Sequence, residues 1–156
     1  MFYSLLKGAI ILIFLIPTQI SAQASNIPIS KAVKYRDNVN APLTQSELEK
    51  INEVYQNNTK DQVLERPMHL KRIKHLLRNR IRIITIDRID KQRGYQLMSE
   101  VELFNHYNSN LKRDVVFNKE TFNPLKYSFE FFAPIPKMYR VDGTNYFIQI
   151  KSQFQE

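Results

Sequence analysis

The sequence predicts an α+β fold, with two N-terminal helices packed on a four- to five-stranded antiparallel sheet. Three observations support this class. Apolar residues recur at helical spacing over 45–80, their period changes to two from about residue 81, and an Asp142-Gly143 pair is typical of a tight hairpin turn. The chain has 156 residues, 43% of them hydrophobic, which suits a single domain, expected here over residues 43–156.

Residues 1–24 have the features of a secretory signal peptide. Lys7 precedes an apolar run over 8–16, and residues 22–24 (Ala-Gln-Ala) match a small-residue cleavage pattern. The apolar run is much shorter than the roughly 20 residues that span a bilayer, which argues against a membrane anchor. We therefore expect an exported protein, periplasmic or secreted, with cleavage near Ala22 or Ala24.

Residues 25–42 contain two prolines and no sustained period, so we expect an extended N-terminal arm there. Thr44 and Glu47 then have the spacing of a capping box, which predicts a helix over about 45–56. Pro67 suits the first position of a second helix, and the apolar spacing extends that helix to about residue 80. We expect the apolar side of both helices to cover one face of the sheet.

Alternation of apolar and polar residues predicts the strands. In the run 81–89 the alternation slips at Ile83-Ile84, so we expect a bulge or burial on both faces there. The runs 81–89 and 95–103 are separated by a five-residue link, so we expect them to pair as a hairpin. Residues 127–131 form another alternating run. The clearest pair is 138–141 with 144–151, because the Asp-Gly sequence between them tolerates the positive φ that a two-residue turn requires.

The composition excludes several classes of chemistry. The chain has no cysteine, which removes thiol catalysis, zinc ribbons, iron–sulfur clusters and disulfide frameworks. It has three glycines, too few for a glycine-rich phosphate loop. The sequence contains neither a Gly-x-Ser-x-Gly motif nor a helical histidine pair with zinc-ligand spacing. We therefore expect a non-enzymatic protein with no cofactor and no metal site.

The positive charge is concentrated in one segment. Residues 65–93 hold ten Lys and Arg residues against three acidic ones, whereas the rest of the chain after the leader is balanced. A concentrated cationic surface attracts anions. The expected partner is an anionic envelope component, either a lipid head group or an acidic polysaccharide, with nucleic acid ranked below both. The alternative is a solvated helix surface. The candidate anion-binding residues are Lys71, Arg72, Lys74, Arg78, Arg80 and Arg82.

A second hypothesis is a structural or assembly protein that binds another protein through its C-terminal aromatic hairpin. Two pairs of adjacent aromatic residues, at 131–132 and 146–147, place rings on both faces of the predicted strands. One of these faces must then be covered by another part of the chain or used for binding. The candidate residues are Phe129, Phe131, Phe132, Tyr146 and Phe147.

A third hypothesis is a secreted basic phosphodiesterase or ribonuclease. His69, His75 and His106 would supply the acid and base groups, and neighbouring cations would stabilise the phosphate. His69 and His75 are six positions apart on a predicted helix and do not share a face. This hypothesis requires two of the three imidazoles close together beside a cation.

The C-terminal third contains several short motifs, among them FNPLKY at 122–127 and YRVDGTNY at 139–146. Through these motifs, residues 94–153 resemble a family of small exported bacterial proteins that has no assigned activity. The resemblance implies an exported protein of a bacterial envelope that ends in a hairpin. It supplies no catalytic residue and does not include the basic segment.

Overall fold

The computed structural model describes residues 33–88 and 92–154. The chain divides into two units, Met1–Ser30 and Lys31–Glu156, and the second unit contains all of the described residues. The predicted leader, the first part of the predicted arm and part of the link after residue 88 lie outside the described residues.

Side chains fix the start of the first helix. Helix α1 (Gln45–Tyr55) begins after Thr44, whose hydroxyl accepts a hydrogen bond from the Glu47 N–H at 3.2 Å. The Glu47 carboxylate in turn accepts from the Thr44 N–H at 2.9 Å, which confirms the predicted capping box. Before this helix, Asp37–Asn40 form a short 3-10 helix (η1) in which Val39 is buried. This part of the arm is therefore not extended as predicted, because coiling buries Val39.

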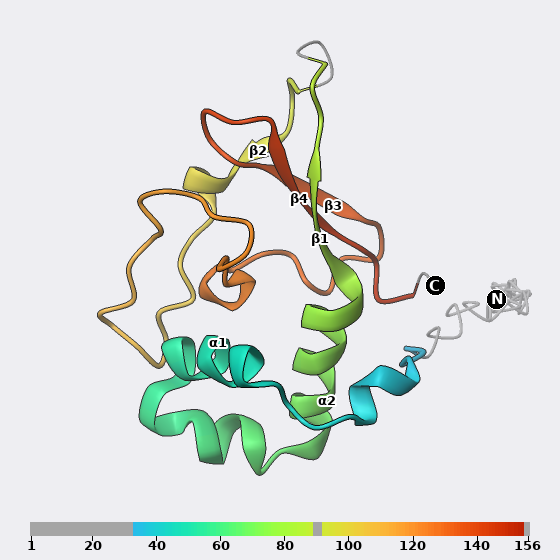
Figure 1. The fold of residues 1–156 in the computed structure, drawn as a ribbon, viewed down its shortest axis with the longest axis vertical. Coiled ribbons are helices and arrows are strands. Elements are labelled where there is room, and N and C mark those ends of the chain that lie inside the picture. Colours follow the sequence, from blue (N-terminus) through green and yellow to red (C-terminus); the bar gives the residue numbers. More distant parts are fainter. Residues whose placement is uncertain (1–32, 89–91, 155–156) are drawn as a thin grey trace, which may run out of the picture. The chain divides into compact units, whose positions relative to one another are not determined.

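The second helix leads directly into the sheet. Two helical turns, η2 (Gln56–Asn58) and η3 (Lys60–Leu64), connect α1 to α2 (Pro67–His75), and Pro67 is the first residue of α2 as predicted. A π-helical turn, η4 (Leu76–Arg80), continues α2 to the residue at which the first strand begins. Figure 1 shows this continuous path from helix to strand.

Within residues 33–88 and 92–154 the sheet has four strands, in the order β1-β4-β3-β2. They are β1 (Ile81–Thr85), β2 (Gln96–Leu97), β3 (Lys137–Arg140) and β4 (Tyr146–Ile150). Strand β4 is antiparallel to both β1 and β3, whereas the short β2 is parallel to β3. Two helices followed by a mixed, mostly antiparallel sheet confirm the predicted α+β class.

The predicted hairpin between 81–89 and 95–103 is wrong. Strand β1 pairs with β4 instead, so that Ile81 lies opposite Ile150 and Ile83 lies opposite Ile148. This register places four isoleucines on one face of the sheet, where they pack in the core. Residues 95–103 do not form one continuous strand, because the chain coils into a 3-10 helix at Met98–Glu100, so they do not pair with β1 along its length.

Three of the predicted strands are clearly shorter than expected. The run predicted over 81–89 forms a strand only from Ile81 to Thr85. After Leu97 the chain turns into a 3-10 helix, η6 (Met98–Glu100), which ends β2 after two residues. The alternating run 127–131 contributes one isolated bridge, between Leu103 and Tyr127. Beyond β2 and this bridge, the residues that follow Leu97 and Tyr127 use their apolar side chains to cover the sheet.

The C-terminal hairpin is confirmed, but the predicted two-residue turn is wrong. The Val141 N–H donates to the Tyr146 carbonyl at 2.9 Å, so residues 142–145 form a four-residue loop between β3 and β4. Of the two predicted turn residues only Gly143 has a positive φ, +65°, which glycine adopts without steric cost. The Asp142 carboxylate accepts hydrogen bonds from the Ser99 N–H at 2.9 Å and from the Ser99 hydroxyl at 2.5 Å. These two bonds attach the turn to η6.

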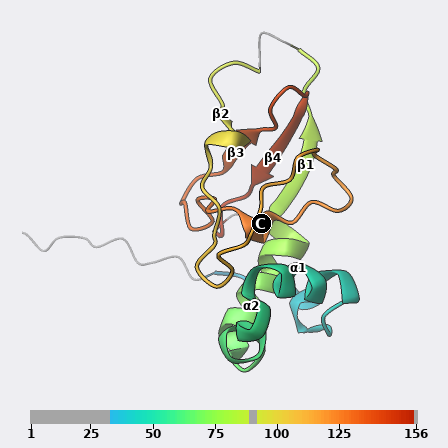
Figure 2. The ribbon, with the colours of Figure 1, turned by 90° about the vertical axis from the view of Figure 1, so that its left-hand side faces the viewer.

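The buried apolar side chains form two clusters. In the first, sheet residues such as Ile148 pack against side chains of the segment 98–129, including Tyr127. In the second, α1, α2 and η3 pack around Leu125, and Ile81 contacts both clusters. Figures 1 and 2 show the two helices at one end of the sheet. The segment 98–129 therefore supplies most of the cover for the inner face of the sheet, where we expected the helices.

Candidate binding pocket

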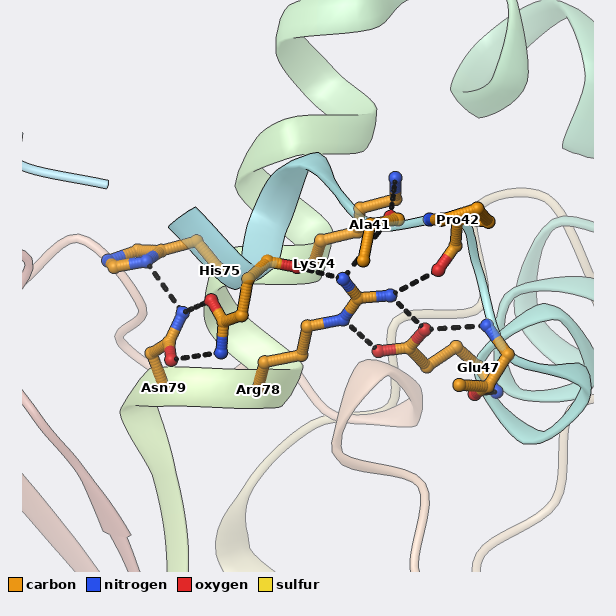
Figure 3. A network of polar contacts seen from close by, with 9 residues as sticks. Ala41, Pro42, Glu47, Lys74, His75, Arg78 and Asn79 are labelled. Atoms are coloured by element: carbon orange, nitrogen blue, oxygen red, sulfur yellow. Dashed lines mark hydrogen bonds and ion pairs between the residues drawn. The ribbon is translucent and has the colours of Figure 1, made fainter. Parts of the chain in front are cut away.

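Two of the candidate anion-binding residues hold parts of the fold together (Figure 3). The Arg78 guanidinium forms a bidentate ion pair with Glu47, with both N···O distances at 2.6 Å, and donates to backbone carbonyls in the segment 38–42. The Lys74 ammonium donates to the Ala41 carbonyl at 2.7 Å. These contacts attach η1 and the following residues to α1 and α2, so both cations are engaged within the molecule.

Arg80 is also buried, with 6% of the residue exposed. Its Nε donates to the Lys151 carbonyl at 3.0 Å and its Nη2 donates to the Phe131 carbonyl. Among the described residues it has no ion pair, and its Nη1 makes no hydrogen bond. Burial lowers the pKa of this guanidinium, but the group stays charged at neutral pH because an arginine pKa ordinarily lies at about 12 or above.

The other three candidate cations are more accessible. Arg72 and Arg82 are exposed, and their guanidinium groups form no ion pair with any residue of the described ranges. Lys71 is half-buried, and its Nζ lies 4.8 Å from the centroid of the Tyr35 ring, within cation–π distance. The six predicted residues therefore do not form an uninterrupted cationic strip.

A pocket of about 360 Å³ lies between α2, the segment 125–132 and the residues that precede η1. Its volume falls within the range of small-molecule sites. Much of the wall is aromatic, from Tyr35, Tyr55, Phe104, Tyr127, Phe129, Phe131 and Phe132. Polar groups on the wall come from His69, Arg72, His75, Arg80, Ser128 and Gln153. The pocket thus contains members of all three predicted sets: the cations, the C-terminal aromatic residues and the histidines.

Two of the three histidines line this pocket. The His69 Nε2 lies 3.3 Å from the Tyr55 hydroxyl, and the His75 Nδ1 lies 3.2 Å from the side-chain amide of Asn79. Burial, followed by the charges of neighbouring arginines, lowers the pKa of both imidazoles, so that both are mainly neutral at pH 7. His106 is exposed and lies outside this pocket.

The five aromatic residues predicted to bind a protein do not form one exposed surface. Phe129 and Phe147 are buried, and Phe131 and Tyr146 are half-buried against the sheet core. Phe132, in contrast, is 70% exposed. Phe129, Phe131 and Phe132 line the pocket, whereas the two residues of β4 do not.

Sequence reasoning missed the pocket residues that come from distant segments. Tyr35 precedes η1, Tyr55 ends α1, and Phe104 and Ser128 lie in irregular segments. The helical spacing of Tyr55 indicated a core position, and its ring does pack with Phe104, with 6.1 Å between centroids. No local pattern connects these residues, because packing between segments far apart in the chain brings them together.

The described residues contain no cluster of three or more histidine or acidic side chains that could hold a metal ion. None of the helices in the described ranges is long and apolar enough to cross a membrane. Comparison of the chain with protein-family models, with curated proteins and with solved structures found no match. The resemblance of residues 94–153 to exported bacterial proteins therefore stays a prediction.

Proposed function

We propose that this protein is an exported, non-enzymatic binding protein whose pocket takes an amphiphilic anion. The apolar part of the ligand lies among the aromatic side chains, and its anionic head lies beside Arg80 and Arg72. The charge distribution led us to expect an anionic envelope component as the partner. The proposed ligand is one kind of such component, a small lipid-like molecule. A pocket of about 360 Å³ suits such a ligand better than a polysaccharide or nucleic acid chain.

The observation that carries the proposal is the buried guanidinium of Arg80. Desolvation of a charge costs several kcal/mol, so a buried cation is normally paired with an anion. The partners of Arg80 in the described ranges are two carbonyl oxygens, which do not neutralise its charge. A carboxylate or phosphate in the pocket would accept a hydrogen bond from its Nη1 and supply the counter-charge.

The rest of the pocket wall favours the same ligand. The Arg72 guanidinium is exposed and has no ion pair in the described ranges, so it is available to a ligand head group. An apolar tail that covers the aromatic wall removes apolar surface from water, at roughly 25 cal/mol for each Å² buried. A ligand with an anionic head group and an apolar tail would contact both the arginines and the aromatic wall of the pocket.

Calorimetric titration with octanoate, 1-octanol and octylamine tests the proposal, because these probes share an apolar tail and differ in the charge of the head group. We expect octanoate to bind roughly tenfold more tightly than octanol, as a charge-assisted hydrogen bond predicts. Octylamine should bind more weakly than octanol, because its charge repels the arginines. Equal affinity for octanoate and octylamine would overturn the proposal.

Two matched tryptophan variants locate the ligand. Ser128→Trp places a large side chain on the pocket wall and should weaken octanoate binding roughly tenfold or more. Ser109→Trp, at an exposed serine away from this pocket, should leave the affinity unchanged. Arg72→Gln should weaken binding roughly threefold, as expected for a solvated charge contact. If Ser128→Trp binds octanoate as wild type does, the ligand occupies another site.

One observation favours a second function, phosphodiester cleavage: His69 and His75 line the same pocket as two arginines. The contacts of these imidazoles with Tyr55 and Asn79 engage one nitrogen of each ring, and the other nitrogen could transfer a proton. Hydrolysis of bis-p-nitrophenyl phosphate that disappears in His69→Gln and His75→Gln would support this function. A rate equal to that of buffer alone would reject it.

Export is a separate part of the proposal and rests on the predicted leader at 1–24. Expression of the whole chain in a bacterium should yield periplasmic or secreted protein whose first residue is Gln23 or Ser25. N-terminal sequencing of the recovered protein measures this directly. Protein that keeps Met1 and stays in the cytoplasm would contradict export.

A further inference from the structure

The segment 132–136 exposes two large apolar side chains beside the pocket. Phe132, which lines the pocket, is 70% exposed, and Ile135 is 63% exposed. The segment also contains two prolines, so it cannot continue a strand. It is held in place, because the Ser152 hydroxyl donates to the Pro134 carbonyl at 2.7 Å. The two apolar side chains are therefore presented to solvent on an anchored segment.

Three cations lie beside this segment. Lys151 precedes Ser152, the residue that anchors the segment. Arg82 lies opposite Gln149 in the β1–β4 pair, so Lys151 is its diagonal neighbour on the same face. Arg36 follows Tyr35, which lines the pocket together with Phe132, so Arg36 belongs to the chain segment at that side of the pocket. Burial lowers the pKa of the Lys151 ammonium, and the charges of Arg82 and Arg36 lower it further.

These three cations have no acidic partner in the described part of the chain. The ion pairs found there involve other cations, such as Arg78 with Glu47 and Lys137 with Glu130. Unpaired cations around exposed apolar side chains are the combination that favours the interface of an anionic bilayer. A protein partner would match the apolar residues but would need an acidic surface of its own to match the cations.

We propose that the segment 132–136, with Arg36, Arg82 and Lys151, forms a docking surface for an anionic lipid bilayer. Phe132 and Ile135 enter the interfacial layer, and the three cations contact the lipid head groups. This inference rests on the proposed function, because docking brings the rim of the pocket to the surface that supplies an amphiphilic anion. We call these residues the docking surface.

Co-sedimentation with vesicles tests the docking surface. The chain from Ser25 to Glu156, which contains the whole unit 31–156, is mixed with vesicles of phosphatidylcholine alone or of phosphatidylcholine with phosphatidylglycerol. We expect binding to the anionic vesicles at least roughly tenfold stronger than to the neutral ones, and we expect it to weaken as salt is raised. Equal binding to both kinds of vesicle would overturn the proposal.

Two sets of variants have matched controls. Phe132→Ser with Ile135→Ser should weaken binding to anionic vesicles roughly tenfold, whereas Val115→Ser with Val116→Ser, at two exposed valines elsewhere, should not. Replacing the three cations of the docking surface with Gln should weaken binding at least roughly tenfold. The control for the cations replaces three exposed basic residues elsewhere with Gln, namely Arg66, Arg93 and Lys112. Equal losses in variant and control would mean that net charge alone drives the binding, which would overturn the proposal.

Octanoate titration of the same variants separates this inference from the proposed function. The three cations do not line the pocket, so their Gln variant should bind octanoate as wild type does. Normal octanoate binding with unchanged vesicle binding would overturn the docking surface alone. Vesicle binding that follows the expected pattern without any octanoate binding would support the docking surface and reject the pocket function. Wild type could instead form a dimer and bind no vesicles, with the dimer dissociating in the Phe132→Ser and Ile135→Ser variant. This result would mean that the surface binds a second copy of the chain, and it would overturn the docking surface.

Discussion

The Arg78 guanidinium shows how one side chain positions a segment. It connects the carboxylate of Glu47, at the start of α1, to backbone carbonyls of the segment 38–42 (Figure 3). Both side chains of this pair are largely buried, with 14% of Arg78 and 12% of Glu47 exposed. The hydrogen bond from Arg78 lowers the pKa of the Glu47 carboxyl even though burial opposes this shift. The ion pair is therefore part of the packing of η1, α1 and α2.

Replacing Arg78 should destabilise the fold. Arg78→Gln leaves the Glu47 carboxylate without its cation and should lower the free energy of unfolding by about 3 kcal/mol. Arg78→Lys keeps the charge but loses the bidentate geometry, so we expect about half of that loss. Urea denaturation measures both values. Arg72→Gln, at an exposed position of α2, is the control and should change stability by less than about 0.5 kcal/mol. An equally small effect of Arg78→Gln would show that the ion pair does not stabilise the fold.

The two pocket histidines predict how stability depends on pH. Folding lowers the pKa of His69 and His75 below the usual value of 6.5, so the unfolded chain binds more protons in mildly acidic solution. The free energy of unfolding should therefore be highest above pH 6.5 and should fall as the pH drops through this value. Urea denaturation at pH 7.5 and pH 5.5 checks this, and His69→Gln with His75→Gln should reduce the difference. His106→Gln is the control and should keep the pH dependence of wild type. If the double variant also keeps the full pH dependence, His69 and His75 are not its source.

At the scale of elements, the pairing of β1 with β4 joins the two helices to the C-terminal hairpin. Strand β1 continues from α2, and β4 lies between β1 and β3, so the sheet contains segments about 65 residues apart in the chain. The short link between β1 and β2 suggested that these two strands pair as a hairpin. Strand β1 pairs with β4 instead, because the isoleucines of β1 and β4 then lie opposite each other on the buried face of the sheet. Strand pairing here follows the burial of isoleucine side chains.

A cross-link tests this strand pairing directly, because the chain has no cysteine of its own. Arg82 and Gln149 lie opposite each other, so Arg82→Cys with Gln149→Cys should form a disulfide under mild oxidation. Arg82→Cys with Glu102→Cys joins positions that would face each other in the hairpin expected from the sequence, and it should stay reduced. Mass spectrometry after blocking of free thiols distinguishes the two results. Efficient closure of the second pair alone would contradict the β1–β4 pairing.

At the scale of the whole second unit, one short segment connects the two hydrophobic clusters. In the 3-10 turn η7 (Pro124–Lys126), Leu125 enters the helical cluster, while the next tyrosine, Tyr127, enters the sheet cluster. Between them, the buried Lys126 ammonium lies 2.6 Å from Asp114 and 3.0 Å from Glu53. This segment therefore joins the helical cluster to the sheet cluster. Leu125 and Tyr127 make the apolar contacts, and Lys126 between them makes the ion pairs.

This connection predicts cooperative unfolding. Leu125→Ala should lower the free energy of unfolding by about 2–4 kcal/mol, because it removes a buried side chain from the helical cluster. Far-ultraviolet circular dichroism and tyrosine fluorescence should report one coincident transition in wild type and variant. Leu64→Ala, at a residue that is 39% exposed, is the control and should cost about 1 kcal/mol or less. Separate helical and sheet transitions in wild type would contradict the shared core.

The features predicted correctly from the sequence are those that depend on neighbouring residues. The capping box at Thr44, the helix start at Pro67 and the turn at Gly143 each follow from contacts or backbone angles within a few positions. The α+β class could be predicted for the same reason, since the change of apolar period is a local property. Part of the candidate site was also predicted, because Arg72, Arg80 and the phenylalanines at 129–132 stand out in the composition of their segments.

Strand pairing and the roles of the cations could not be predicted from the sequence, because they depend on contacts between residues far apart in the chain. Arg78 meets Glu47 across 31 positions, and Arg80 meets the Lys151 carbonyl across 71. An arginine in a basic run has the same local signature whether it faces solvent, binds a carbonyl or lines a pocket. Its role is settled by which distant oxygen atoms and apolar side chains the folded chain places around it, because desolvation and pairing, and not the run of charges, set its free energy.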